Sequence, residues 1–296
     1  MPKKPPLTKR KSKWAANRDV TLRGKQLNYN AAQQRRYVAD LEKLIAKMTK
    51  DVKKSIENLF NGKIADDYFE GQQEASAMDA SIASQARILM NKLTRSFTQL
   101  FNSKAAYLAE KMVNASAKVS KSTLHDSLKQ LSGGLSLPTG VVPQGMEDVA
   151  AATIAENVSL IKSIPEQYLK NVTGAVMRSI TTGNGLADLV PEINKYSGQT
   201  VRRAKNLALD QTRKAYNSIN KQRMQAVGVT HFTWIHSYGG QKPRESHIKI
   251  DGHTFSFANL EAEQAALGVP KEDRNIPGHA INCRCTTQPV IKFEDE

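Results

Sequence analysis

The feature that most constrains the fold is a stretch of nearly fifty residues whose apolar side chains keep one helical rhythm. No Pro or Gly interrupts it. Spacings of three and four residues predict one amphipathic helix, which at about 1.5 Å per residue would be roughly 70–80 Å long. Because water does not tolerate an exposed apolar stripe of that length, we expect another helix or another subunit to cover it. The residues that set the rhythm are Ile82, Ala86, Leu89, Leu93, Phe97, Leu100, Phe101, Ala105, Leu108, Met112, Ala115, Val119, Leu124 and Leu128.

Helical periodicity also occurs on both sides of this stretch. It runs from Asn30 to Gly62 before it, and over residues 146–182 after it. A short helix over 186–196 and a longer one over 200–227 are predicted next, with Gly228 as the terminating residue. Gly and Pro residues near 132–145 and 182–186 predict two breaks in the helical pattern.

Beyond Gly228 the helical rhythm gives way to alternation and aromatic residues, which is typical of strands. Residues 230–236, 254–257 and 286–291 predict a small antiparallel sheet of two or three strands. The fold class is therefore α+β and predominantly α, a body of long amphipathic helices followed by a small α+β domain. We predict three parts: a basic, disordered arm over 1–36, a helical body over 37–228 and a C-terminal domain over 229–296.

The charge of +15 is concentrated at the N-terminus. Residues 1–36 hold eleven basic residues and one acid, Asp19, which gives +10 in this segment. A segment so charged and so poor in apolar residues is not expected to fold alone. It is either a solvated tail or an arm that binds the phosphates of DNA or an acidic surface. The basic residues are Lys3, Lys4, Lys9, Arg10, Lys11, Lys13, Arg18, Arg23, Lys25, Arg35 and Arg36.

Most of the residue types that carry chemistry lie near the C-terminus. Both cysteines and five of the six histidines follow Gly228. In an extended segment, Cys283 and Cys285 face the same side and Arg284 faces the other, where we expect it to pair with Asp251 or Asp210. A structural cluster is predicted from Trp234, Arg244, Asp251, Gly252 and Arg284.

Thiolate and imidazole are ligands that zinc prefers, so His247, His279, Cys283 and Cys285 form a possible metal site, with His253 nearby in the sequence. The alternative is that the two thiols are small buried apolar groups. Two cysteines one residue apart are too close for an ordinary disulfide, which favours a reducing compartment. No cofactor other than this possible structural zinc is predicted.

The C-terminal pattern resembles the phage Mu F-like family of head morphogenesis proteins, the minor capsid proteins of tailed bacteriophages. The resemblance covers roughly residues 170–291, and its most specific part is Cys283-Arg284-Cys285. It also includes Trp234, Arg244, His247, Gly252 and His279. Many family members carry Cys-x-x-Cys where this chain has Arg244-Glu245-Ser246-His247, so a four-cysteine metal site is impossible here.

The resemblance implies a non-enzymatic minor head protein, located in the virion after assembly in the host cytoplasm. The partners it implies are the portal protein, the major capsid protein or both. The charge of the basic arm adds DNA as an expected partner, and self-association through the long helices is a further expectation. No apolar run is long enough for a membrane span, so no membrane partner is expected. Two alternatives remain. One is an enzyme or toxin-like effector that acts on nucleic acid, with His247 and His279 as base and acid and Arg244 or Arg284 on the phosphate; the other is a plain DNA-binding protein.

Overall fold

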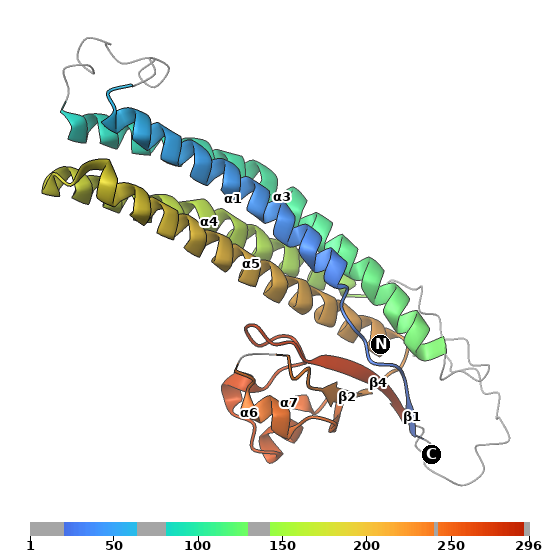
Figure 1. Cartoon of the computed structure of the whole chain (residues 1–296). Coiled ribbons are helices and arrows are strands. Elements are labelled where there is room, and N and C mark those ends of the chain that lie inside the picture. The colour runs from blue at the N-terminus through green and yellow to red at the C-terminus, as the bar shows by residue number, and fades with distance from the viewer. Residues whose placement is uncertain (1–20, 64–80, 130–142, 240–241, 293–296) are drawn as a thin grey trace, which may run out of the picture. The chain divides into compact units, whose positions relative to one another are not determined.

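A computed structural model describes residues 21–63, 81–129, 143–239 and 242–292. Four long helices dominate it: α1 (Ala31–Phe60), α3 (Ile82–Lys129), α4 (Met146–Thr182) and α5 (Gly185–Ala226). A small sheet and the short helices α6 (Glu245–Lys249), α7 (Leu260–Ala266) and η2 (Lys271–Asp273) complete it (Figure 1). The predicted fold class, mainly helical with a small antiparallel sheet near the C-terminus, is confirmed.

The helices are longer and less interrupted than the sequence predicts. Helix α3 runs without a break, as expected, and α4 continues through Pro165. Helix α5 is one helix where two were predicted, with Pro191 and Gly198 inside it. Ile193 and Ala204 are both fully buried and lie about three turns apart, hence on one face. Packing along that face outweighs the low helix propensity of Gly and Pro. None of the helices in the described ranges has the length and apolar character needed to cross a membrane.

The chain divides into two compact units that do not follow the predicted domain boundaries. A helical unit comprises Gln34–Lys111 and Ile154–Ala208. A sheet unit comprises the residues up to Gln33, Met112–Thr153 and the residues from Leu209 onward. The predicted boundary at residue 228 therefore falls within the sheet unit, and α3, α4 and α5 each contribute residues to both units.

The helical unit is a bundle of segments from all four long helices. Lys111 of α3 lies 2.7 Å from Asp40 of α1, Tyr37 of α1 donates to Asn157 of α4, and Arg203 of α5 donates to Ser163 of α4. The apolar faces meet inside the bundle, where Leu89, Phe97, Phe101 and Leu108 of α3 are buried among residues of the same chain. The expectation that the apolar stripe of this helix is covered is thus confirmed for the part that belongs to the helical unit.

The sheet unit contains four antiparallel strands in the order β1-β4-β2-β3. They are β1 (Thr21–Arg23), β2 (His231–Ile235), β3 (Thr254–Ser256) and β4 (Thr286–Lys292). β2, β3 and β4 match the predicted strands, and β4 lies between β1 and β2. One core cluster joins residues of α3 and α5, such as Leu124 and Tyr216, to Ile291 of β4.

The strand β1 corrects the prediction that residues 1–36 form a disordered arm. Thr21–Arg23 pair with β4, Leu27 is fully buried, and Asn30 Oδ1 accepts the Ala32 and Gln33 amides at the start of α1. Pairing and a helix cap satisfy the backbone here in spite of the local charge. Residues 1–20, which carry most of that charge, lie outside the described residues.

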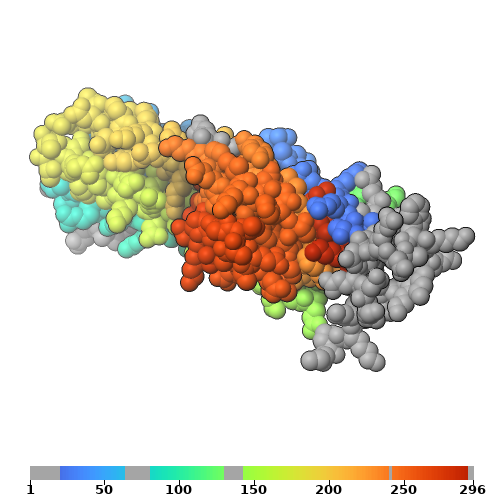
Figure 2. Space-filling model, turned by 90° about the horizontal axis from the view of Figure 1, so that it is seen from below, coloured from blue at the N-terminus to red at the C-terminus, as the bar shows by residue number. Residues whose placement is uncertain are grey.

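We call residues 229–292 the C-terminal lobe. A second core cluster fills it, with Phe232 and Trp234 of β2, Phe255 of β3, Ile250 and Val269 among its members. In the space-filling view the residues of the lobe, coloured orange to red, form a compact mass (Figure 2). Cys283 and Cys285 belong to the same cluster, which brings the candidate site into the core of the lobe.

Candidate metal centre

Three side chains from distant parts of the lobe meet in its core: His247, Cys283 and Cys285. We call them the sulfur–imidazole cluster. His247 lies on the short helix α6, whose first turn begins with the hydrogen bond from the His247 amide to the Arg244 carbonyl. The two cysteines directly precede β4, whose first residue, Thr286, is paired with Ile235 of β2. Helix α6 and the β2–β4 register therefore fix the cluster from two sides.

The ligand atoms of the cluster are close enough to share one ion. His247 Nδ1 lies 3.6 Å from Cys283 Sγ and 3.8 Å from Cys285 Sγ. All three ligand atoms lie within 4.8 Å of one another, and all three residues are buried. The Trp234 and His247 rings pack edge to face, with the centroids 4.9 Å apart. The prediction that both sulfurs point at one centre agrees with this geometry.

Without a metal, the two thiols behave as one coupled acid. The hydrogen bond from Cys285 and, as a smaller contribution, His247 together lower the pKa of the Cys283 thiol to about 4 against the effect of burial. The neighbouring Cys283 sulfur and burial raise the pKa of the Cys285 thiol, while the Ser237 backbone and the Trp234 side chain act in the opposite direction. The pair thus holds one proton tightly and gives up the other readily, so a dication bound by both sulfurs as thiolates would have to displace the tightly held proton as well.

The donor set fits zinc. Zinc–sulfur bonds of about 2.3 Å and zinc–nitrogen bonds of about 2.0–2.1 Å place nitrogen and sulfur ligands about 3.5 Å apart around a tetrahedral ion. The two nitrogen–sulfur distances in the cluster are close to that value. Two thiolates, a neutral imidazole and Zn²⁺ also sum to zero charge, which suits a buried site. Among the described residues, no fourth His, Cys, Asp or Glu joins this group.

The predicted structural cluster braces the segments around these ligands. Arg244 Nε lies 3.0 Å from Asp273, and its Nη2 donates to the Ile281 carbonyl. Asp251 accepts hydrogen bonds from the His236 amide and the Tyr238 hydroxyl. The Gly252 amide donates to the carbonyl of Trp234, a fully buried residue. These contacts join the start of α6 to Asp273 and Ile281, and the end of β2 to the turn before β3.

Arg284 has a different partner from the one predicted. Its guanidinium donates to the Gly239 carbonyl, rather than pairing with Asp251 or Asp210. Asp251 is occupied as described above, while Asp210 lies 3.0 Å from Lys214 and accepts the Asn282 amide at 2.6 Å. Arg284 does face away from the two sulfurs, as the alternation predicts, and from there it reaches the backbone of the loop after β2.

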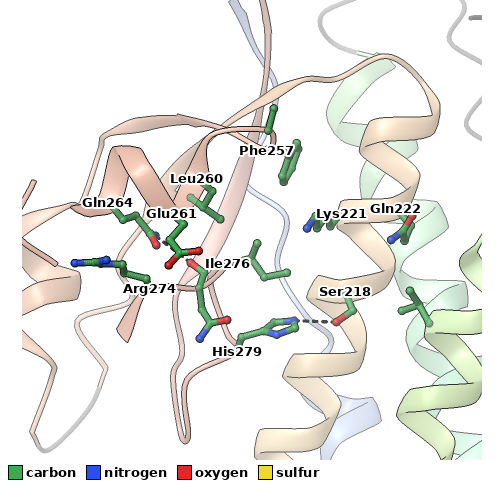
Figure 3. Close-up of a pocket in the computed structure, with 13 residues that line it drawn as sticks. Ser218, Lys221, Gln222, Phe257, Leu260, Glu261, Gln264, Arg274, Ile276 and His279 are labelled. Carbon is green, nitrogen blue, oxygen red and sulfur yellow. Dashed lines mark hydrogen bonds between the residues drawn. The ribbon is translucent and has the colours of Figure 1, made fainter. Parts of the chain in front are cut away.

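His279, the fourth predicted ligand, lies in another part of the sheet unit. Its Nε2 is hydrogen-bonded to Ser218 Oγ of α5 at 2.8 Å, on the wall of a pocket of about 440 Å³ (Figure 3). Lys221 and Glu261 also line this pocket. His247 thus contacts the two cysteines, whereas His279 contacts Ser218 of α5. An enzyme that used them as base and acid on one phosphate would need both rings at one centre.

The turn before His279 requires glycine. Gly278 has φ +83°, and a Cβ at this position would overlap Asn217 Nδ2 and lie 3.2 Å from its Cγ. We expect Gly278→Ala to destabilise the protein by about 2 kcal/mol, because it combines an unfavourable φ with a steric overlap. Gly252→Ala is the control, since Gly252 has φ +77° and nothing lies within 4 Å of its added Cβ. Equal free energies of unfolding for the two variants would show that Asn217 moves aside freely.

The predicted DNA-binding residues divide into two groups. Those before residue 20 lie outside the described residues: Lys3, Lys4, Lys9, Arg10, Lys11, Lys13 and Arg18. Of the others, Arg23 donates to Thr233 across the sheet, and Lys25, Arg35 and Arg36 are exposed. The described residues therefore include four of the eleven cations and do not form one surface of all eleven.

Sequence reasoning named Asp210 of α5 as a partner in this region but missed Asn217 and Ser218 of the same helix. Asp210, Asn217 and Ser218 contact the segment 278–282. The signal in the sequence is that the polar residues Asp210, Asn217 and Asn220 recur at helical spacing. In the structure all three are buried. Polar side chains at core positions of a helix mark hydrogen-bonding partners elsewhere in the chain.

Comparison with known proteins agrees with the C-terminal pattern. Residues 170–288, from α4 through the sulfur–imidazole cluster and into β4, match the family described as Phage Mu protein F like protein. The chain thus carries a Phage Mu protein F like region over residues 170–288. The match includes every residue of the cluster and of the bracing contacts, so these are features of the Mu F-like part of the chain.

A curated relative extends the similarity beyond the Mu F-like region. A protein of Haemophilus influenzae (strain ATCC 51907 / DSM 11121 / KW20 / Rd), described as an uncharacterized protein, is 31% identical over 261 residues. The alignment covers 88% of this chain and 54% of the relative, so the chain spans about half the length of the curated protein it matches. No solved structure matches the chain.

Proposed function

We propose that the chain is a minor head protein of a tailed bacteriophage, and that it acts in head morphogenesis beside the portal without catalysing a reaction. The observation that carries the proposal is the Mu F-like match over residues 170–288. The portal protein, the major capsid protein and packaged DNA are the proposed partners, and the virion is the proposed location.

The arrangement of the polar residues supports a structural role for the lobe. A catalytic group needs a path to its substrate, whereas His247, Cys283 and Cys285 are all buried. Arg244 and Arg284, the candidates for binding a phosphate, each donate to a backbone carbonyl of the lobe. These side chains join segments of the chain to one another, as expected for a part that must keep its shape within an assembly.

Mass spectrometry of purified particles of the phage that encodes the chain tests the head role. We expect the chain at low copy number relative to the major capsid protein. Particles that lack it, prepared from cells in which the chain is made, would overturn the proposal.

We further propose that the sulfur–imidazole cluster binds structural zinc. His247 Nδ1 and the two sulfurs would hold the ion, and a water molecule or a group outside the described residues would take the fourth tetrahedral position. When bound, the ion would neutralise the thiolates and tie α6 to the start of β4. The alternative of buried free thiols predicts no metal in the purified protein.

The basic arm is proposed to bind duplex DNA without sequence preference. The plot of log K against log salt has a negative slope, to which each phosphate contact contributes about 0.9. Replacing the seven Lys and Arg residues before residue 20 with Gln should make that slope less steep by about six. Binding to a short duplex at several salt concentrations measures this slope. An unchanged slope would assign the DNA contacts to other residues.

A further inference from the structure

Helix α1 presents a row of four lysines on its exposed side. Lys43, Lys47, Lys50 and Lys54 follow one another at spacings of four, three and four residues, and all four are exposed. At 100° per residue they lie within an arc of about 60°, and the row is about 16 Å long. We call these residues the lysine stripe.

The acidic residues of α1 do not neutralise the stripe. Asp40 is engaged by Lys111 at 2.7 Å and Glu57 lies 3.9 Å from Lys53, both cations outside the stripe. Glu42 and Asp51, the other two acids of α1, are half-buried, and Asp51 lies four residues after Lys47 and three before Lys54. Within the part of the chain that the structure describes, no ion pair or hydrogen bond is made by the four stripe lysines.

The row has an energetic cost to the helix. Like charges three or four residues apart repel one another on a helix surface, and the stripe contains three such neighbouring pairs. Asp51, at the same spacings from Lys47 and Lys54, offsets part of this repulsion. The opposite face of α1, with Leu41, Ile45, Met48 and Val52 buried, already supplies the packing that holds the helix in the bundle. The lysines are thus not needed for packing, and an anionic partner would relieve their repulsion.

The surroundings of the stripe favour nucleic acid over a protein or a membrane. Protein interfaces have apolar cores and are depleted in lysine. Binding of a helix to a membrane surface requires apolar side chains to insert. Among the described residues, the large apolar side chains that are exposed lie outside α1, at Ile82, Tyr107, Tyr238, Ile248 and Ile281. Four lysines in a row offer point charges at spacings of about 5–6 Å, which suit a chain of phosphates.

We propose that the lysine stripe binds the backbone phosphates of duplex DNA without reading sequence. Lysine supplies charge without the fixed fork with which arginine reads a guanine edge, and neither aromatic residue of α1, Tyr37 or Phe60, is exposed. The inference deepens the proposed function by giving it a folded DNA-binding surface apart from the N-terminal arm. It does not require the chain to be present in the virion.

The test uses the full chain and a short duplex of arbitrary sequence, with binding followed by fluorescence anisotropy. The variant replaces the four stripe lysines with Gln, a good helix former, so the bundle should stay folded. We expect the negative slope of log K against log salt to become less steep by about three to four. Between about 50 and 200 mM salt, the unchanged chain should lose roughly a hundredfold more affinity than the variant.

Two matched variants separate a defined surface from diffuse charge. Replacing Lys104, Lys162, Lys195 and Lys205 with Gln removes the same charge from exposed positions of the helical unit that do not form a row. For this scattered variant, the slope of log K against log salt should change little. Replacing the stripe lysines with Arg should preserve the slope. Equal slopes for the stripe variant and the scattered variant would overturn the proposal.

Polyglutamate and phosphatidylserine vesicles serve as alternative polyanions. The replacement of the stripe lysines with Gln should lower the affinity for DNA more than the affinity for polyglutamate or for the vesicles. A larger effect on polyglutamate or on vesicles would overturn the assignment to DNA. Failure to find the chain in particles would leave these solution results untouched, so the head role and the stripe are tested separately.

Discussion

Purified protein is expected to contain about one equivalent of zinc, and a variant with Cys283→Ala and Cys285→Ala should contain none and have a much less stable lobe. Structural zinc contributes on the order of 10 kcal/mol to the folding of small zinc peptides. The C-terminal lobe has an apolar core of its own, so we expect a smaller loss, about 3–5 kcal/mol. Elemental analysis and the free energy of unfolding of the lobe measure the two effects.

Chelator and a histidine control make this test specific. In the presence of chelator, the unchanged chain should become as unstable as the double alanine variant, which itself should not respond. His253→Ala should retain both the metal and the stability, because His253 is an exposed histidine of the same lobe outside the cluster. A metal-free protein that is indifferent to chelator, with thiols that react only after unfolding, would establish the buried-thiol alternative.

Phe101→Ser is expected to be the most damaging single substitution in the helical unit. Phe101 is fully buried among α3 and its neighbours, so the change leaves a large cavity and also buries a hydroxyl. We expect a loss of about 4–5 kcal/mol, a large share of the total stability of an ordinary domain. Denaturant unfolding followed by circular dichroism at the helical band measures it.

Tyr107→Ser on the same helix provides the comparison. Tyr107 is an aromatic residue with 61% of its surface exposed, and the substitution should change the stability by no more than about 0.5 kcal/mol. If the two variants were equally stable, the apolar stripe of α3 would be solvated in the native protein, and the helical unit would need a different packing.

Periodicity predicts well where one face of an element is buried along its whole length. Helix α3 shows this, because its buried positions recur with the same spacing from Ala86 to Leu128. The break predicted in α5 was wrong because propensity is local: Pro191 and Gly198 favour a helix end, while the packing of Ile193 and Ala204 is set by residues far away in the sequence.

The candidate site was predictable to the extent that alternation determines which way a side chain faces. The spacing of Cys283 and Cys285 predicts a common direction for their sulfurs, and both lie near His247. Sequence alone could not decide which of His247 and His279 lies beside the two sulfurs, because both histidines lie next to turn residues in the same short region. Their partners, the two sulfurs for one and Ser218 for the other, come from tertiary packing.

The pairing of β1 with β4 has a consequence for how the protein is made. Gly24, next to β1, accepts a hydrogen bond from Gln288, which lies 264 residues later. During synthesis, a ribosome adding about 5–20 residues per second will have released β1 many seconds before β4 exists. The helical unit ends at Ala208, so all of its residues have been made before β4 is synthesised. We therefore expect the nascent chain to hold a folded bundle while the first strand waits, unpaired and next to a cationic segment that discourages aggregation, until the last strand arrives.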